Sequence, residues 1–278
     1  MKIIFYLPTI EKGVCYNKLG DYMEIINETI YTSDGVGLEV EKYIPLNSKG
    51  IIYFNHGITV PKESPGNVLK DTAIALCAAG YKVITYDMRG HGKSGGLGTD
   101  ITVEKSLSDF DVIFKSETDD LPIGMLGFSY GGAISILYSY LNKIKLKALV
   151  LYSPVWEFDE SFINNKNSVF GMDIIEAKES GSLEKDGFVL IKKNKFKIGK
   201  EFINTAINYF PYKHVKDLNT KVLTLQAKND VILSMDLSIK YGKDISDKFM
   251  ILDAIHPLVE EKDKAILESV NWFNKYFD

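Results

Sequence analysis

The sequence has no long hydrophobic run. Nothing in its 278 residues approaches the roughly 20 consecutive apolar residues that a membrane-spanning helix needs. The apolar stretch before Pro8 has only about five residues, which is shorter than the apolar core of roughly 7–15 residues in a secretory signal. We therefore expect no membrane insertion and a cytoplasmic location.

The chain also has little excess charge and little cysteine. Its formal net charge is −4, and no five consecutive residues carry the same charge. This pattern argues against a nucleic acid partner, which would favour basic stripes. Cys15 and Cys77 have no metal-ligand spacing, and Cys77 lies in an alanine-rich helical pattern that predicts a buried thiol.

Strand and helix patterns alternate over most of the chain. Alternating β-formers over 22–33 and 36–45 predict a hairpin around Asp34-Gly35. Short apolar runs, typical of buried strands, and helical patterns follow one another. The expected strands are 50–55, 82–86, 123–128, 147–152, 221–226 and 248–252, and the expected helices are 64–79, 104–118, 130–142, 235–243 and 262–276. The alternation predicts an α/β fold in which helices cover both faces of a mostly parallel sheet.

Residues 155–219, called here the inserted segment, interrupt this alternation. They are rich in aromatic side chains, which argues against disorder. Within them, 187–198 alternates around Lys193-Asn194 and predicts a small hairpin. We expect the inserted segment to form a cap over one end of the sheet, with 1–154 and 220–278 forming the core.

A serine lies between glycines where a predicted strand becomes a predicted helix. Gly127-Phe128-Ser129-Tyr130-Gly131 matches the pattern G-x-S-x-G. In that pattern a sharp turn presents the serine hydroxyl above the carboxyl edge of the sheet. The N-terminus of the following helix favours negative charge that develops there. Ser129 is therefore the predicted nucleophile.

A serine nucleophile needs a base, and the chain offers four histidines. With this turn the order along the chain is serine, acid, histidine. His56 and His91 precede the serine, and His214 precedes the strand expected to carry the acid. His256, between the last predicted strand and the last predicted helix, is the predicted base.

The acid is expected just after the strand at 221–226. Asp230 lies there, although an aspartate that only opens a turn is a competing interpretation. Asp236 and Asp253 are rivals, but Asp236 should lie within a helix and Asp253 is close to His256 in sequence.

A tetrahedral oxyanion needs two preorganised N–H donors. The backbone N–H of Tyr130 is the first expected donor, because Tyr130 follows the nucleophile. The second is expected from the loop after strand 50–55, at the backbone of Ile58. In the same loop His56 is expected to be a structural hydrogen-bonding residue.

The motifs taken together resemble the α/β-hydrolase superfamily. They are HGITV (56–60), YDMRGHGKSGG (86–96), GFSYGG (127–132), AKND (227–230) and His256. The resemblance runs from about residue 35 to the end and implies a triad of Ser129, Asp230 and His256, with N–H donors from Ile58 and Tyr130. It is looser toward two groups, the bacterial feruloyl and cinnamoyl esterases and the monoacylglycerol lipases and lysophospholipases. QAKND and DAIHP lack a glycine that many relatives have before the acid and the histidine, and residues 1–21 match no motif.

These features predict a serine hydrolase that cleaves carboxylic esters of small to medium acyl or aromatic acids, without metal or cofactor. The partner would be a small-molecule ester or thioester. One alternative is an acyl thioesterase or acyltransferase that uses the same triad. Four lysines of the inserted segment could meet an acidic carrier, although they also fit a solvated hairpin face; they are Lys192, Lys193, Lys195 and Lys197. A non-catalytic binding protein on a hydrolase scaffold is the other alternative.

Overall fold

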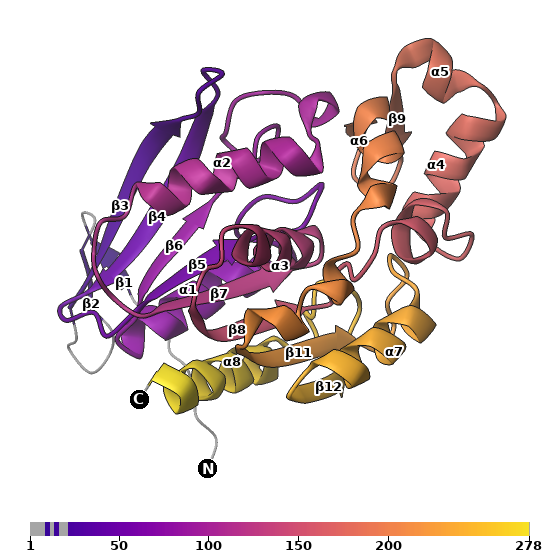
Figure 1. The fold of residues 1–278 in the computed structure, drawn as a ribbon. Helices are drawn as coiled ribbons and strands as arrows, with labels where there is room; N and C mark the ends of the chain where they lie inside the picture. Colours follow the sequence, from indigo (N-terminus) through magenta and orange to yellow (C-terminus); the bar gives the residue numbers. More distant parts are fainter. Residues whose placement is uncertain (1–8, 12–13, 17–21, 278) are drawn as a thin grey trace.

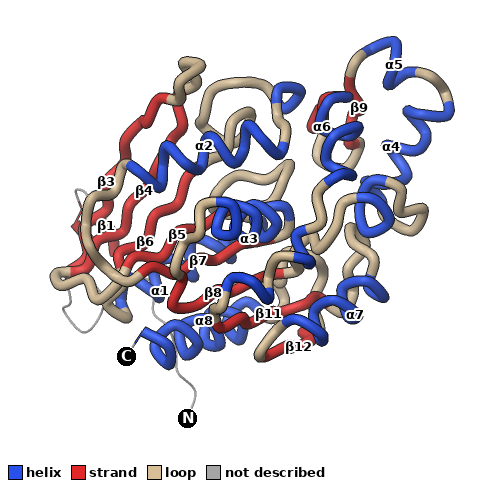
Figure 2. The backbone as a smooth tube through the Cα atoms, in the orientation of Figure 1, coloured by secondary structure: helices blue, strands red, loops and turns tan. Residues whose placement is uncertain are grey.

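The computed structural model describes residues 9–11, 14–16 and 22–277, and its described part contains one ten-stranded sheet (Figures 1 and 2). Along the sheet the strand order is β1-β2-β3-β4-β6-β5-β7-β8-β11-β12. The strands are β1 (Thr9–Glu11), β2 (Val14–Tyr16), β3 (Tyr22–Tyr31), β4 (Gly37–Pro45), β5 (Ile51–Asn55), β6 (Lys82–Tyr86), β7 (Ile123–Phe128), β8 (Leu146–Tyr152), β11 (Lys221–Ala227) and β12 (Lys248–Leu252).

The sheet is parallel from β6 to β12 and antiparallel from β1 to β6. The parallel strands come from apolar runs, and every residue of β5 is buried, as expected for a strand covered on both faces. The hairpin predicted around Asp34-Gly35 joins β3 to β4. The predicted α/β fold is therefore confirmed, and β1 and β2 add two short strands that the sequence analysis did not predict.

Helices cover both faces of the sheet (Figure 1). Apolar side chains of α1 and α8 join one buried cluster, and those of α2, α3 and α7 join another. The helix predicted at 64–79 begins later, after a single turn at Pro65–Asn67. None of the helices in the described ranges could span a membrane, since each is too short or too polar. The helices are α1 (Val68–Ala78), α2 (Val103–Lys115), α3 (Tyr130–Leu141), α7 (Met235–Ile245) and α8 (Lys262–Phe277).

The inserted segment leaves the sheet after β8 and returns at β11, which pairs with β8. It contains the predicted hairpin, formed by β9 (Phe188–Ile191) and β10 (Phe196–Gly199), and three helices that the sequence analysis did not predict (Figure 1). They are α4 (Val169–Glu179), α5 (Ser182–Asp186) and α6 (Lys200–Thr205). Single helical turns of the inserted segment lie at Asp159–Ile163, Ala206–Asn208, Pro211–Lys213 and Lys216–Leu218. In the core, a further single turn lies at Gly98–Asp100, before α2.

Aromatic side chains attach the inserted segment to the core. Phe158 and Phe202 are fully buried. Their rings lie 6.0 and 5.6 Å from the ring of Tyr130, measured between centroids. Trp156 and Phe162 belong to the same apolar cluster, which also contains side chains of α3 and β8. Many aromatic residues of this segment therefore serve its packing.

Candidate active site

The chain makes a strained turn at Ser129, between β7 and α3. Ser129 has φ 53° and ψ −118°, a conformation that a residue other than glycine rarely adopts. Hydrogen bonds on both sides hold it there. Its N–H donates to the carbonyl of Tyr152 at 2.9 Å, and its own carbonyl accepts from the N–H groups of Gly132 and Val155 at 3.0 and 3.1 Å.

The glycines around the serine are required by close approach of other atoms. A Cβ on Gly131 would lie 2.0 Å from the carbonyl oxygen of Asn55, at the end of β5. A Cβ on Gly127 would lie 2.5 Å from the Cα of Gly132, and one on Gly132 would lie 2.7 Å from Pro154. The turn can therefore bring Ser129 to the sheet edge only because these positions lack side chains.

His256 reaches the serine from the loop between β12 and α8. Its Nε2 lies 2.8 Å from the Oγ of Ser129, and its ring lies 5.1 Å from that of Phe128 between centroids. The loop turns sharply at the buried Leu258, which has φ 61° and whose N–H donates to the carbonyl of Ile255. The ring is thus held against the end of β7 and directed at the serine hydroxyl.

Asp230 lies on the far side of the imidazole, in the loop after β11. Its Oδ2 is 2.7 Å from the Nδ1 of His256 and also accepts from the side-chain amide of Gln226 at 3.2 Å. Its Oδ1 accepts from the N–H groups of Ile232 and Leu233. Burial disfavours the ionised carboxylate, but the contact with the imidazole of His256 and these hydrogen bonds outweigh burial, so the pKa of Asp230 lies below its ordinary value.

The rival candidates lie elsewhere. Asp236 is exposed in the first turn of α7. Asp253 is exposed and accepts from the side-chain amide of Asn229 at 3.2 Å. His214 stacks on Tyr140, with ring centroids 4.0 Å apart. The structure therefore brings together the three residues selected from the sequence, and the missing glycines in QAKND and DAIHP do not displace them.

The two expected N–H donors belong to segments that border Ser129. Tyr130 is the first residue of α3, where a helix leaves its N–H without an intrahelical acceptor. Ile58 follows Gly57, where an added Cβ would lie 3.2 Å from the Cβ of Ser129. Among the residues that the structure describes, the backbone N–H of neither Ile58 nor Tyr130 donates a hydrogen bond. Both N–H groups are therefore available to donate hydrogen bonds to an oxyanion.

His56 fixes the peptide that carries the Ile58 N–H. Its Nε2 accepts from the N–H of Met88 at 2.8 Å, so the ring proton is on Nδ1, which donates to the carbonyl of Gly57 at 2.7 Å. That carbonyl belongs to the same planar peptide group as the Ile58 N–H. Burial lowers the pKa of His56, which keeps the ring neutral. The expectation that His56 is a structural hydrogen-bonding residue is confirmed.

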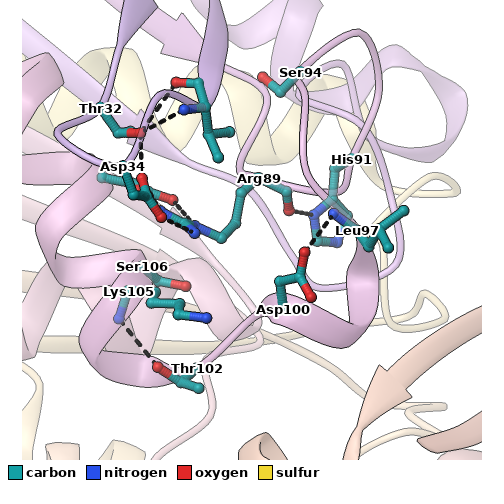
Figure 3. A network of polar contacts seen from close by, with 12 residues as sticks. Thr32, Asp34, Arg89, His91, Ser94, Leu97, Asp100, Thr102, Lys105 and Ser106 are labelled. Atoms are coloured by element: carbon teal, nitrogen blue, oxygen red, sulfur yellow. Dashed lines mark hydrogen bonds and ion pairs between the residues drawn. The ribbon is translucent and has the colours of Figure 1, made fainter.

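The loop after β6 carries most of the motif YDMRGHGKSGG, whose residues had no predicted role of their own. The side chain of Arg89 donates to both carboxylate oxygens of Asp109 on α2, at 2.6 Å each, and to both oxygens of Asp34 in the β3–β4 turn. Figure 3 shows Arg89 between Asp34 and the loop that carries His91. The arginine in DMRGHG could have suggested a buried ion pair, but the carboxylates that pair with Arg89 lie far away in sequence.

The fold agrees with that of solved structures. An esterase from Pyrococcus furiosus superposes with a TM-score of 0.67 and 18% identity, over 92% of this chain and 94% of that one. A family model described as serine aminopeptidase, S33, matches residues 47–177. The chain has the α/β-hydrolase fold. The region that the family model matches contains Ser129 and both expected N–H donors.

The curated proteins that the chain resembles are distant from it. Caffeoylshikimate esterase from Arabidopsis thaliana is 24% identical over 169 residues, which are 53% of this chain and 50% of that protein. A Mycoplasma genitalium protein named provisionally as an esterase/lipase is 23% identical over 239 residues, covering 76% of this chain and 83% of that protein. The chain spans half or less of the length of two curated relatives that it matches, the Arabidopsis enzyme among them.

Proposed function

We propose that this protein is a carboxylic ester hydrolase with Ser129 as nucleophile, His256 as base and Asp230 as the residue that orients the base. One observation carries the proposal: the Oγ of Ser129, the imidazole and the carboxylate form a continuous hydrogen-bonded line, with contacts of 2.8 and 2.7 Å. The esterase names of the relatives in Arabidopsis and Mycoplasma, and of the Pyrococcus structure, support an ester as substrate.

The reaction follows from this geometry. His256 takes the proton of Ser129 through Nε2 while the Oγ attacks the ester carbonyl. Asp230 holds the Nδ1–H and stabilises the imidazolium, which then donates its proton to the leaving alcohol. The N–H groups of Ile58 and Tyr130 stabilise the oxyanion. Water attacks the acyl-enzyme in a second round through the same residues and releases the acid.

The proposed substrates are esters of small to medium acyl or aromatic acids, and residues 155–219 form a cap over a core of 1–154 and 220–278. The cap is supported by the position of the helices and hairpin of the inserted segment, which lie beyond the end of the sheet that carries Ser129 (Figure 1). The aromatic acids are supported by the name of the Arabidopsis relative, caffeoylshikimate esterase, which refers to an ester of an aromatic acid. The acidic-carrier alternative is less supported, since Lys192 pairs with Glu176 at 2.6 Å within the inserted segment. A cytoplasmic location is part of the proposal.

The test is hydrolysis of p-nitrophenyl esters of increasing acyl length and of methyl ferulate, by the parent protein and by Ser129→Ala. We expect turnover by the parent and a loss of at least about 10³-fold in the variant. Amino-acid p-nitroanilides serve as the peptidase comparison. Turnover of p-nitroanilides alone, or ester turnover that survives in Ser129→Ala, would contradict the proposal.

A further inference from the structure

Thr59, next to the proposed oxyanion donor, has a strained backbone. Its φ is 69°, and positive φ is a strong outlier for a β-branched residue. Strain of this kind persists only where the surroundings hold the residue in place. Two side chains do so here: the Nε2 of His91 accepts from the Thr59 N–H at 2.8 Å, and the side-chain amide of Asn194 donates to the Thr59 hydroxyl at 2.5 Å.

His91 is itself fixed on three sides. It is only 4% exposed, and because Nε2 accepts from Thr59, its proton is on Nδ1, which donates to the Arg89 carbonyl at 2.9 Å (Figure 3). The ring of Phe196 stacks on it, with centroids 4.7 Å apart and planes inclined by 24°. Arg89 is in turn held by two carboxylates, so the His91 ring has little freedom.

Both Asn194 and Phe196 belong to the β9–β10 hairpin of the inserted segment. This hairpin is seated closely on the loop that precedes α2. A Cβ on Gly98 would lie 2.5 Å from the Lys197 carbonyl, and one on Gly199 would lie 2.1 Å from the carbonyl of Thr99. The hairpin therefore contacts the core through backbone as well as through these two side chains.

We propose that the β9–β10 hairpin positions the oxyanion donor, acting through His91 and Thr59 on the backbone of Ile58. The inference rests on the proposed function. The Thr59 N–H and the Ile58 carbonyl form one planar peptide, which His91 fixes, while His56 fixes the peptide before it. Held on both sides, the Ile58 N–H keeps a fixed direction. Asn194, Phe196 and His91 are thus positioning residues, and the hairpin contributes to kcat for any ester.

The test separates positioning from binding by acyl length. Steady-state hydrolysis of p-nitrophenyl acetate and p-nitrophenyl octanoate is measured for the parent, Asn194→Ala, Phe196→Ala and Phe196→Leu, with thermal unfolding of each. Loss of an oxyanion donor costs 10²–10³ in kcat, so a misplaced donor should cost roughly tenfold in Phe196→Ala. We expect roughly threefold in Asn194→Ala, which removes one exposed hydrogen bond. Both losses should be equal for the two esters, with KM nearly unchanged.

Lys193→Ala is the matched control, since Lys193 is an exposed neighbour in the same turn, and it should retain the parent kcat. An increase in KM for the octanoate alone would overturn the proposal, because the hairpin would then only bind acyl chains. The rate at which a fluorophosphonate labels Ser129 provides a second readout, since that reaction also develops charge on an oxygen. If the parent hydrolyses neither ester, the proposed function fails, and equal labelling rates in parent and variants would separately overturn the hairpin's role.

Discussion

Asp230 shows how much of the site depends on single side chains. Its Oδ1 is occupied by two backbone N–H groups and its Oδ2 by His256 and Gln226. The carboxylate therefore has a fixed orientation and presents one lone pair to the imidazole. Asp236 and Asp253, which are close by in sequence, lack these hydrogen bonds. The surrounding structure, rather than the residue type, therefore decides which aspartate can orient the imidazole.

Asp230→Asn should lower kcat by about 10³–10⁴, because the amide favours the wrong imidazole tautomer and cannot stabilise the imidazolium. The measurement is kcat for p-nitrophenyl butyrate near neutral pH. Asp236→Asn and Asp253→Asn change exposed carboxylates and should leave kcat within about twofold of the parent. A larger loss in either of these than in Asp230→Asn would assign the orienting role to another residue.

His91 should impose a pH dependence on stability. Burial, and secondarily the neighbouring imidazole of His56, lower the pKa of His91 to about 3, whereas histidine in an unfolded chain has a pKa of about 6.5. Between these values the unfolded chain binds the additional proton. The free energy of unfolding therefore falls as pH drops below about 6.5, by up to about 1.4 kcal/mol per pH unit from this residue.

His91→Gln removes this contribution, so its unfolding free energy should fall less steeply than the parent's between about pH 6.5 and 4. Urea denaturation at several pH values measures both slopes. Asn194→Ala, which removes no titratable group, should keep the parent slope. Equal slopes in the parent and His91→Gln would mean that the ring binds its proton equally well in the folded and the unfolded protein, which contradicts the lowered pKa.

Arg89 joins elements far apart in sequence, the β3–β4 turn and α2. The side chain of Asp109 is 2% exposed, and that of Asp34 is 51% exposed. Removing one partner of a buried ion pair is strongly destabilising, whereas an exposed pair contributes little. Asp109→Asn should therefore lower the free energy of unfolding by about 3 kcal/mol or more, and Asp34→Asn by less than about 1 kcal/mol.

Urea denaturation of the two variants measures the difference. They form a matched pair, since each removes one charge that faces the same guanidinium. A larger effect of Asp34→Asn would indicate that the β3–β4 turn, rather than α2, depends on Arg89.

At the scale of the whole molecule, the features that could be predicted from the sequence are those that local patterns encode. Apolar runs located the parallel strands, and the serine turn with its order of serine, acid and histidine selected the residues that meet at the sheet edge. The helices of the inserted segment were not predicted, because they do not alternate with strands of the central sheet. Their apolar residues pack on the core, a contact that the local sequence does not reveal. The roles of His91 and Asn194 depend on contacts across 32 and 135 positions, which no local pattern reports.

The packing of the inserted segment has a consequence for unfolding. Its buried aromatic residues share one apolar cluster with α3 and the central strands, so we expect the segment and the core to unfold together. The chain has two tryptophans, and they report on different parts. Trp156 is buried in the inserted segment, and Trp272 lies on α8.

In Trp272→Phe the only remaining tryptophan is Trp156, which reports on the inserted segment. In Trp156→Phe the only remaining tryptophan is Trp272, which reports on the core. In each variant, the urea midpoint from tryptophan fluorescence should coincide with that from far-ultraviolet circular dichroism, because a shared cluster cannot lose one half while the other stays packed. A fluorescence midpoint below that of circular dichroism in Trp272→Phe would show that the segment detaches first. Activity would then be lost with detachment, ahead of global unfolding, if the hairpin holds the oxyanion loop.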